Sequence, residues 1–142
     1  MVITIHQPEH FPYSGFFQKM SAADLFIVLD NVNYRKNYFQ NRNKFVNKSG
    51  NEEWFSIQVE KGATSKHIKD VKVVDGIWRK KIIKKLKQNL GVDLAHLYNH
   101  DKLIDINMDS IEYCRKKLGI NTPMVYASEL NVNGSKSELL AN

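Results

Sequence analysis

The sequence is poor in the features that mark exported or membrane-bound chains. It contains one cysteine, Cys114, which cannot form a disulfide within the chain and favours a reducing compartment. Its apolar runs, such as residues 25–29, are about five residues long, whereas a membrane-spanning helix needs roughly 20. The first residues lack the basic region and small-residue cleavage site of a secretory leader. We therefore expect a cytoplasmic protein without a membrane span.

Sequence motifs for phosphate, metal or activated-serine chemistry are also absent. The chain has no G-x-x-x-x-G-K-[ST], no G-x-G-x-x-G and no G-x-S-x-G. It has neither C-x-x-C nor H-E-x-x-H, the spacings that most often mark zinc ligands. We predict no metal and no other cofactor.

What is present is typical of one globular domain over residues 1–142. Hydrophobic residues make up 42% and charged residues 25% of the 142 positions, which is enough apolar material for a core. Residues 135–138 have the spacing of a capping box, but the apolar face that follows stops within about one turn. We therefore expect either that this chain is the N-terminal part of a longer one or that its last turn docks on a partner.

The net charge of +6 comes from a single segment. Residues 77–90 contain six lysines and arginines and no acid, and the rest of the chain sums to zero. The solvated face of a helix is the simplest interpretation of such a segment. Binding of an anionic ligand, a membrane surface or RNA is the alternative, and we expect no nucleic-acid partner.

Hydrophobic periodicity predicts an α/β fold. A strand over 2–6, a helix over 15–22 capped by Ser14, and a fully apolar strand over 25–29 form a β-α-β unit. We expect a mostly parallel sheet with helices on both faces, in a single compact domain. Later helices are predicted over 77–90 and 102–118, ending at Gly91 and Gly119, and later strands over 43–46, 54–59, 71–74 and 123–126.

Two histidines and a glutamate lie in a stiff loop after the first predicted strand. Pro8 and Pro12 restrict this backbone, and the carboxyl ends of strands are where ligands bind in open α/β sheets. His6 and His10 can act as general acid or base near neutral pH, and Glu9 can orient one imidazole. These three residues are the candidate catalytic groups, and hydrogen-bonded structural histidines are the alternative.

The start of the helix that follows this loop offers a place for an anion. Gly15 lets a ligand approach the first turn, whose free N–H groups favour a phosphate or a carboxylate.

A second polar segment follows the buried strand over 25–29. Amides, a guanidinium and aromatic rings suit a sugar or a nucleotide, although asparagine-rich surface turns have a similar composition. Both segments leave carboxyl ends of strands, so we expect them to meet in one cleft. The candidate binding residues in the second segment are Asp30, Tyr34, Lys36, Asn41, Arg42 and Asn43.

These segments resemble the WbqC-like family of bacteria. The resemblance covers some 40 residues, with His10 and Tyr13 replacing the family's usual aromatic and tryptophan. It implies a role in modifying sugars of surface polysaccharides such as O-antigen, by acyl or aminoacyl transfer to an amino sugar. Gln7 and Tyr13 join the candidate binding residues. The matching residues are His6-Gln7-Pro8, then Phe11 to Lys19, then Ala23 to Asp30, then Tyr34, Lys36, Phe39 and Asn41-Arg42-Asn43.

Three functional hypotheses follow. In the first, a transferase acts on a sugar or sugar nucleotide: His6 or His10 removes a proton from the acceptor, and Arg42 holds phosphate. Its partners would be a phosphorylated sugar and an acyl or aminoacyl donor or carrier. The second is a non-catalytic module that binds a sugar nucleotide or a carrier. The third is nucleic-acid binding through residues 79–87.

Overall fold

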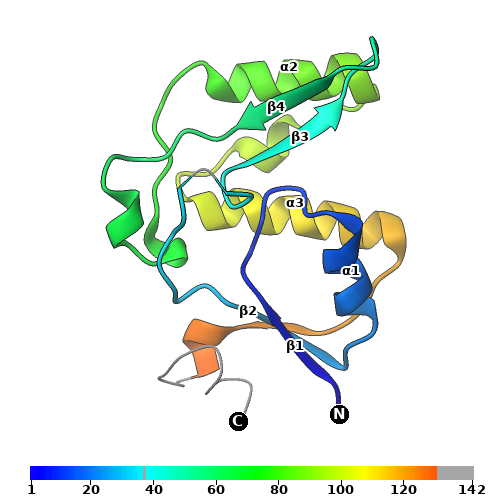
Figure 1. The fold of residues 1–142 in the computed structure, drawn as a ribbon, viewed down its shortest axis with the longest axis vertical. Helices are drawn as coiled ribbons and strands as arrows, with labels where there is room; N and C mark the ends of the chain where they lie inside the picture. Colours follow the sequence, from blue (N-terminus) through cyan, green and yellow to red (C-terminus); the bar gives the residue numbers. More distant parts are fainter. Residues whose placement is uncertain (37, 131–142) are drawn as a thin grey trace.

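A three-stranded parallel sheet forms one end of the molecule (Figure 1). The computed structural model describes residues 1–36 and 38–130. The strands β1 (Ile3–His6), β2 (Leu25–Val28) and β5 (Met124–Tyr126) lie in the order β1-β2-β5, with Ile27 opposite both Ile5 and Val125. The predicted α/β class is confirmed, and so are the strands predicted at both ends of this sheet.

Two helices cover one face of this sheet. The helices α1 (Ser14–Ser21) and α3 (Leu103–Leu118) pack on β2 through one apolar cluster. Phe16 of α1, Phe26 of β2 and Ile111 of α3 are almost completely buried in it. Burial of each such side chain contributes about 1.5–3 kcal/mol, so this cluster fixes the β-α-β unit.

The other face of the sheet packs on a shorter element. Ile5, Ile27 and Leu29 form a small buried cluster with Ala127 of the 3-10 helix η4 (Ala127–Leu130). Helices therefore lie against both faces, as predicted, although the second face meets a single 3-10 turn.

A hairpin and a helix form the opposite end of the molecule. The strands β3 (Arg42–Val46) and β4 (Glu52–Ser56) pair antiparallel, and α2 (Trp78–Leu90) runs beside them (Figure 1). Their common core, with α3, includes Phe55 and Trp78. The short turn between these strands permits only antiparallel pairing, and they make a two-stranded sheet that is separate from the parallel one.

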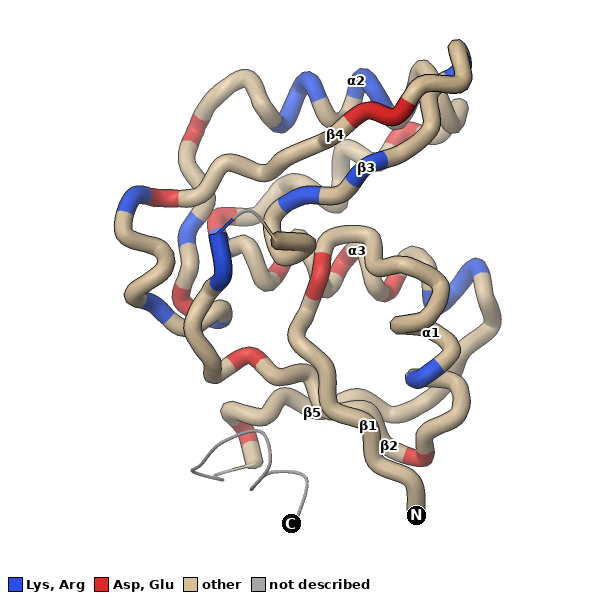
Figure 2. Tube along the Cα trace, in the orientation of Figure 1, with Lys and Arg blue, Asp and Glu red and all other residues tan. Residues whose placement is uncertain are grey.

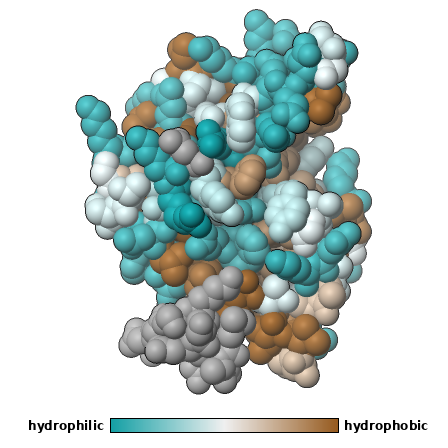
Figure 3. Space-filling model, in the orientation of Figure 1, coloured by the Kyte–Doolittle hydropathy of each residue, from teal (hydrophilic) through white to brown (hydrophobic). Residues whose placement is uncertain are grey.

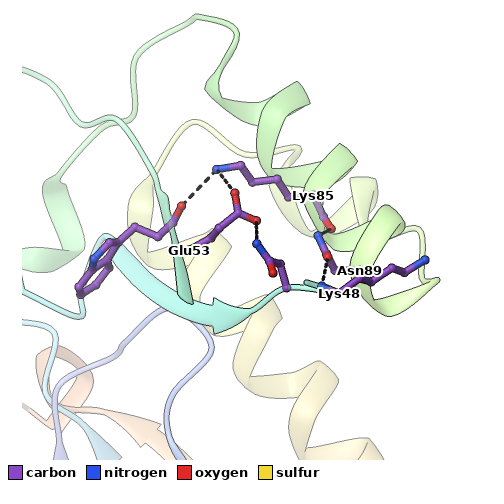
Figure 4. A network of polar contacts seen from close by, with 6 residues as sticks. Lys48, Glu53, Lys85 and Asn89 are labelled. Atoms are coloured by element: carbon purple, nitrogen blue, oxygen red, sulfur yellow. Dashed lines mark hydrogen bonds and ion pairs between the residues drawn. The ribbon is translucent and has the colours of Figure 1, made fainter. Parts of the chain in front are cut away.

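Polar contacts tie the hairpin to α2 (Figure 4). Lys85 Nζ lies 3.9 Å from Glu53 Oε1, and the Lys48 backbone N–H donates to Asn89 Oδ1 at 2.9 Å. Both contacts are largely exposed, so they contribute at most about 1 kcal/mol and orient the helix more than they stabilise it.

Three 3-10 helices lie in the connecting segments, two between β4 and α2 and one between α2 and α3. They are η1 (Ala63–Ser65), η2 (Ile68–Asp70) and η3 (Ala95–Tyr98). The strand predicted over 71–74 is wrong, because this segment makes only isolated bridges: Val73 pairs with Val59, and Lys72 with Lys102.

Helix ends match the predicted stops better than the predicted caps. Gly91 and Gly119 end α2 and α3 with φ of 70° and 69°, values that glycine adopts without strain. Ser14 is the first helical residue rather than the cap, since Tyr13 occupies the cap position. Leu90 and Leu118, the last residues of α2 and α3, are 58% and 60% exposed. The capping box at residues 135–138 lies outside the described residues.

The basic segment forms the outer face of α2 (Figure 2). The view in Figure 3 is mostly hydrophilic over this end, whereas apolar side chains gather at the lower end beside β1. No helix in residues 1–36 and 38–130 has the length and hydropathy needed to cross a bilayer.

Candidate functional site

The two predicted loops lie face to face, as the sequence indicates. Asn43 Nδ2 donates hydrogen bonds to the carbonyl oxygens of His10 and Phe11, at 3.1 and 2.6 Å. The His10 backbone N–H in turn donates to the Phe39 carbonyl at 3.0 Å. In Figure 1 the segment between β1 and α1 accordingly runs beside the start of β3.

Side chains of helix α3 form hydrogen bonds with both loops. Ser110 Oγ accepts from the Phe11 N–H at 3.0 Å, and Asn107 Nδ2 donates to the Gln40 carbonyl at 2.7 Å. Phe11 has a φ of +45°, a value that costs a non-glycine residue free energy. The hydrogen bonds on both sides of Phe11 impose this conformation, so the loop is preorganised.

A first cavity of about 370 Å³ lies between the loops. This size is in the range of small-molecule sites. It contains three candidate residues of the first loop and one of the second. The lining residues are His6, Glu9, Tyr13, Tyr38, Phe39 and Asn43.

His6 and Glu9 are the two groups in this cavity with acid–base chemistry. His6 Nδ1 lies 2.8 Å from the Gln7 carbonyl oxygen. Because a carbonyl can only accept, Nδ1 carries the proton and the lone pair of neutral His6 is on Nε2. Glu9 is 4% exposed, and burial raises the pKa of its carboxyl, with an opposing effect from Lys19. The cavity therefore combines a base with an acid that holds its proton more tightly than usual.

His10 does not belong to this acid–base pair. Its ring is fully buried, its Nε2 lies 2.8 Å from the Tyr98 hydroxyl, and it packs on Phe11 and Phe55. Burial lowers the pKa of His10 to about 3. Since it has neither solvent access nor a place for substrate, the structure gives His10 a packing role in place of the predicted catalytic one.

Gly15 does not offer an open anion site. A Cβ on Gly15 would come within 2.4 Å of Tyr13 Cε2, so the aromatic ring lies directly over the first turn of α1. The absent side chain makes room for Tyr13, whose ring lines the first cavity, and not for a ligand.

Asn43 and Gln7 lie near the first cavity, but their side chains are occupied. The Asn43 amide clamps the first loop, and its Oδ1 accepts from the Lys44 N–H at 2.8 Å. Gln7 Oε1 accepts from Gln40 Nε2 at 2.7 Å. Both residues therefore position the loops rather than orient a sugar.

Four other candidates of the second loop line a separate cavity, of about 660 Å³. Tyr34, Lys36, Asn41 and Arg42 all face it. The Arg42 guanidinium carbon lies 4.4 Å from the centre of the Trp54 ring, as in a cation–π contact. The expected single cleft is thus two cavities that flank the start of β3.

The cause of this division is the strand itself. Side chains alternate across a β-strand, so Arg42 and Asn43 point to opposite sides. Lys36 and Tyr38, which lie in the loop before β3, also line different cavities.

Asp30 lies away from both cavities. It is 3% exposed, and its two carboxylate oxygens accept from the backbone N–H and the hydroxyl of Ser128, at 2.9 and 2.6 Å. Asp30 therefore holds η4 in place, apart from the residues with which it was predicted to bind substrate.

Several residues at the cavities were not predicted from the sequence. Tyr38 and Phe39 line the first cavity and Lys61 the second. Trp54 lies next to the first cavity, where it stacks on Phe39 with ring centres 6.5 Å apart. The exposure of their apolar rings marks the aromatic residues among them, and this exposure can be seen only in the structure. Trp54 and Phe39 are 43% and 38% exposed.

Neither cavity has a donor set for a metal. Within the part of the chain that the structure describes, no group of three or more His, Cys, Asp or Glu side chains could hold a metal ion.

Comparison with known proteins identifies the family. The sequence model of the WbqC-like protein family matches residues 7–142. The chain belongs to the WbqC-like protein family. Apart from His6, which directly precedes the match, both loops of the candidate site lie within the matched region, so the resemblance seen in the sequence is confirmed.

One relative of this WbqC-like chain is Uncharacterized protein Rv1507c from Mycobacterium tuberculosis. It is 27% identical over 154 aligned positions, which cover 99% of this chain. The chain spans 66% of the length of that relative. No solved structure matches the chain.

Proposed function

We propose that this WbqC-like chain is part of a transferase that acts on a phosphorylated sugar, such as a sugar nucleotide. The reaction we favour is acyl or aminoacyl transfer to an amino sugar during synthesis of a bacterial surface polysaccharide. A cytoplasmic location belongs to this proposal. The observation that carries it is the pairing of two cavities at the start of β3, one with acid–base groups and one with cations.

The first cavity is suited to the reacting end of the substrate. His6 Nε2 would take a proton from the acceptor amine or hydroxyl as that atom attacks the acyl carbon of the donor. Glu9, whose pKa burial raises, would give its proton to the leaving group. Return of the proton from His6 to Glu9 then completes the cycle, so no proton is gained or lost.

The second cavity is suited to the phosphate end. The Arg42 guanidinium and the Lys36 ammonium both line it, and an arginine can bind phosphate through two parallel hydrogen bonds. Tyr13, Tyr38 and Phe39 offer the first cavity apolar ring faces on which a sugar can pack.

The test separates chemistry from binding. The assay uses acyl thioesters and activated amino acids as donors and amino-sugar nucleotides as acceptors, with products detected by mass spectrometry. We expect His6→Ala to lower kcat by about 100- to 10,000-fold with little change in acceptor affinity, because a general base acts only in the transition state. His96→Ala, an exposed histidine elsewhere, is the matched control and should leave kcat unchanged.

Arg42 supplies the second half of the test. Arg42→Lys keeps the charge but loses the two-pronged contact, so acceptor affinity should fall about tenfold while kcat changes less. Acceptor binding without transfer from any donor would favour the alternative of a non-catalytic binding module. Equal loss of affinity in the His6 and Arg42 variants, with kcat unchanged, would refute the assigned roles.

A further inference from the structure

Two residues that line the second cavity, Tyr34 and Asn41, each have a buried polar atom whose hydrogen-bonding capacity is unused among the described residues. Tyr34 is 3% exposed, and its hydroxyl has no hydrogen-bond partner among the described residues. The Oδ1 atom of Asn41 is also buried and unpartnered in this part of the chain, whereas its Nδ2 donates to the Ile57 carbonyl at 3.1 Å. Such atoms are rare in native proteins, because an unpaired buried group loses its bonds to water.

The two atoms require different hydrogen-bond partners. The Tyr34 hydroxyl can donate a proton, and Asn41 Oδ1 can only accept one. A ligand that satisfies both must present an acceptor and an N–H or O–H donor. Burial raises the pKa of the Tyr34 hydroxyl to about 12, and the positive charge of Arg42 opposes this rise.

The rest of the cavity divides into an apolar part and a cationic part. Ile57, Val59 and Ala63 give it an apolar wall. Lys36, Arg42 and Lys61 outnumber the single carboxylate, Glu60, which is already paired with Lys66 at 2.5 Å. The cavity therefore favours an anion attached to a flat or apolar group.

We infer that the second cavity binds a nucleoside diphosphate, with the base against the apolar wall and hydrogen-bonded to Tyr34 and Asn41, and the phosphates at Lys36, Arg42 and Lys61. A nucleobase edge offers an acceptor beside an N–H donor, as these two atoms require. This inference rests on the proposed function, because it makes the substrate a sugar nucleotide rather than a simple sugar phosphate. The sugar would then extend past the start of β3 into the first cavity.

The experiment is calorimetric titration of the full chain with UDP, dTDP, GDP, CDP and ADP, and with pyrophosphate and glucose 1-phosphate for comparison. At least one nucleoside diphosphate should bind more tightly than pyrophosphate. Tyr34→Phe should weaken that nucleotide about tenfold, the effect of one lost hydrogen bond, and leave pyrophosphate binding unchanged.

Matched variants separate binding from folding. Tyr98→Phe also removes a buried hydroxyl, but one that is bonded to His10, so it should lower thermal stability and leave nucleotide affinity unchanged. Tyr34→Phe should instead lower the nucleotide affinity without lowering the thermal stability. Lys61→Gln should weaken the nucleotide severalfold, whereas Lys84→Gln, an equal charge loss on the outer face of α2, should not.

Two results would overturn the inference. If no diphosphate binds, or if Tyr34→Phe binds the nucleotide as well as the unchanged chain does, the buried atoms serve only ordered water. Binding of glucose 1-phosphate in that case, with transfer still dependent on His6, would leave the proposed function intact. Nucleotide binding that depends on Tyr34, without transfer from any donor, would uphold the inference and remove the transferase.

Discussion

His6 at the end of β1 and His10 in the loop that follows show how two identical side chains acquire different chemistry. His6 lines a cavity and hydrogen-bonds through Nδ1 to a carbonyl oxygen, which places its lone pair on Nε2. His10, four residues later, is sealed among aromatic rings. Burial disfavours the charged imidazolium, so His10 stays neutral where an exposed histidine would titrate.

The burial of His10 predicts acid sensitivity. Its pKa is about 3 in the folded chain against an ordinary 6.5, so the unfolded state binds the extra proton as the pH falls. The free energy of unfolding should therefore decrease by about 1.4 kcal/mol per pH unit below pH 6.5, until about pH 3. Urea unfolding between pH 7 and pH 4 measures this slope.

The control for this slope is His10→Gln, in which the contribution of His10 to the pH dependence of the unfolding free energy should be absent. Glu9 acts in the opposite direction, since a raised carboxyl pKa favours the folded state at low pH and loses that effect as the pH rises above 4.5. Because Glu9 is present in both proteins, its contribution cancels in the difference between their slopes of unfolding free energy against pH. Identical slopes in the two proteins would show that His10 is not buried as described.

The first loop is held by a few hydrogen bonds rather than by regular structure. Asn43 at the start of β3 and Ser110 on α3 bond to its backbone from two sides, around a residue in the left-handed region. Such strain persists only where surrounding contacts determine the conformation. The position of β3 therefore decides the shape of the first cavity.

Replacing Asn43 should destabilise the conformation of the first loop. Asn43→Asp keeps the shape of the side chain but turns an oxygen toward the carbonyl groups of His10 and Phe11, so we expect a loss of about 2–3 kcal/mol in unfolding free energy. Asn89→Asp, on the surface of α2, is the matched change and should cost less than about 1 kcal/mol. Chemical denaturation compares them, and equal losses would contradict the clamp.

The packing of Tyr13 over α1 leads to a second prediction. Gly15→Ala should raise helix propensity by up to about 1 kcal/mol, yet its Cβ displaces the Tyr13 ring from the first cavity. Sugar-nucleotide affinity should therefore fall severalfold without a loss of thermal stability. In a double-mutant cycle with Tyr13→Ala the two effects should not add, and full additivity would count against this contact.

The overall arrangement was predictable where local patterns decide it. The apolar run over 25–29 gave a buried parallel strand, and Gly91 and Gly119 end the long helices. The meeting of the two loops followed from parallel strands whose carboxyl ends share an edge. The division into two cavities could not be foreseen, because it depends on β3 starting at Arg42, and a shift of one residue would reverse which side chains face each cavity.

Contacts between residues far apart in the chain could not be predicted from the sequence either. His10 is sealed by Tyr98, 88 positions away, and Asp30 is bonded to Ser128, 98 positions away. Neither pair has a local pattern, so the sequence offered both residues as functional groups.

The charge distribution leads to a prediction about the alternative partner. The basic face of α2 lies outside both cavities. Changing Lys80, Lys84 and Lys87 together to Gln should therefore leave nucleoside diphosphate affinity within about twofold at 200 mM salt, where the Debye length is below about 8 Å. A specific RNA affinity that is lost in this variant, and that falls steeply between about 50 and 200 mM salt, would favour nucleic-acid binding instead.

The account depends on one substrate lying across the start of β3. Titration of the isotope-labelled chain with UDP-, dTDP- and GDP-linked amino sugars, followed by nuclear magnetic resonance, tests this directly. We predict that one of them shifts the backbone signals of Glu9 and Tyr13 in the first cavity together with those of Tyr34 and Lys61 in the second. Shifts confined to α2, or to one cavity at saturation, would contradict it.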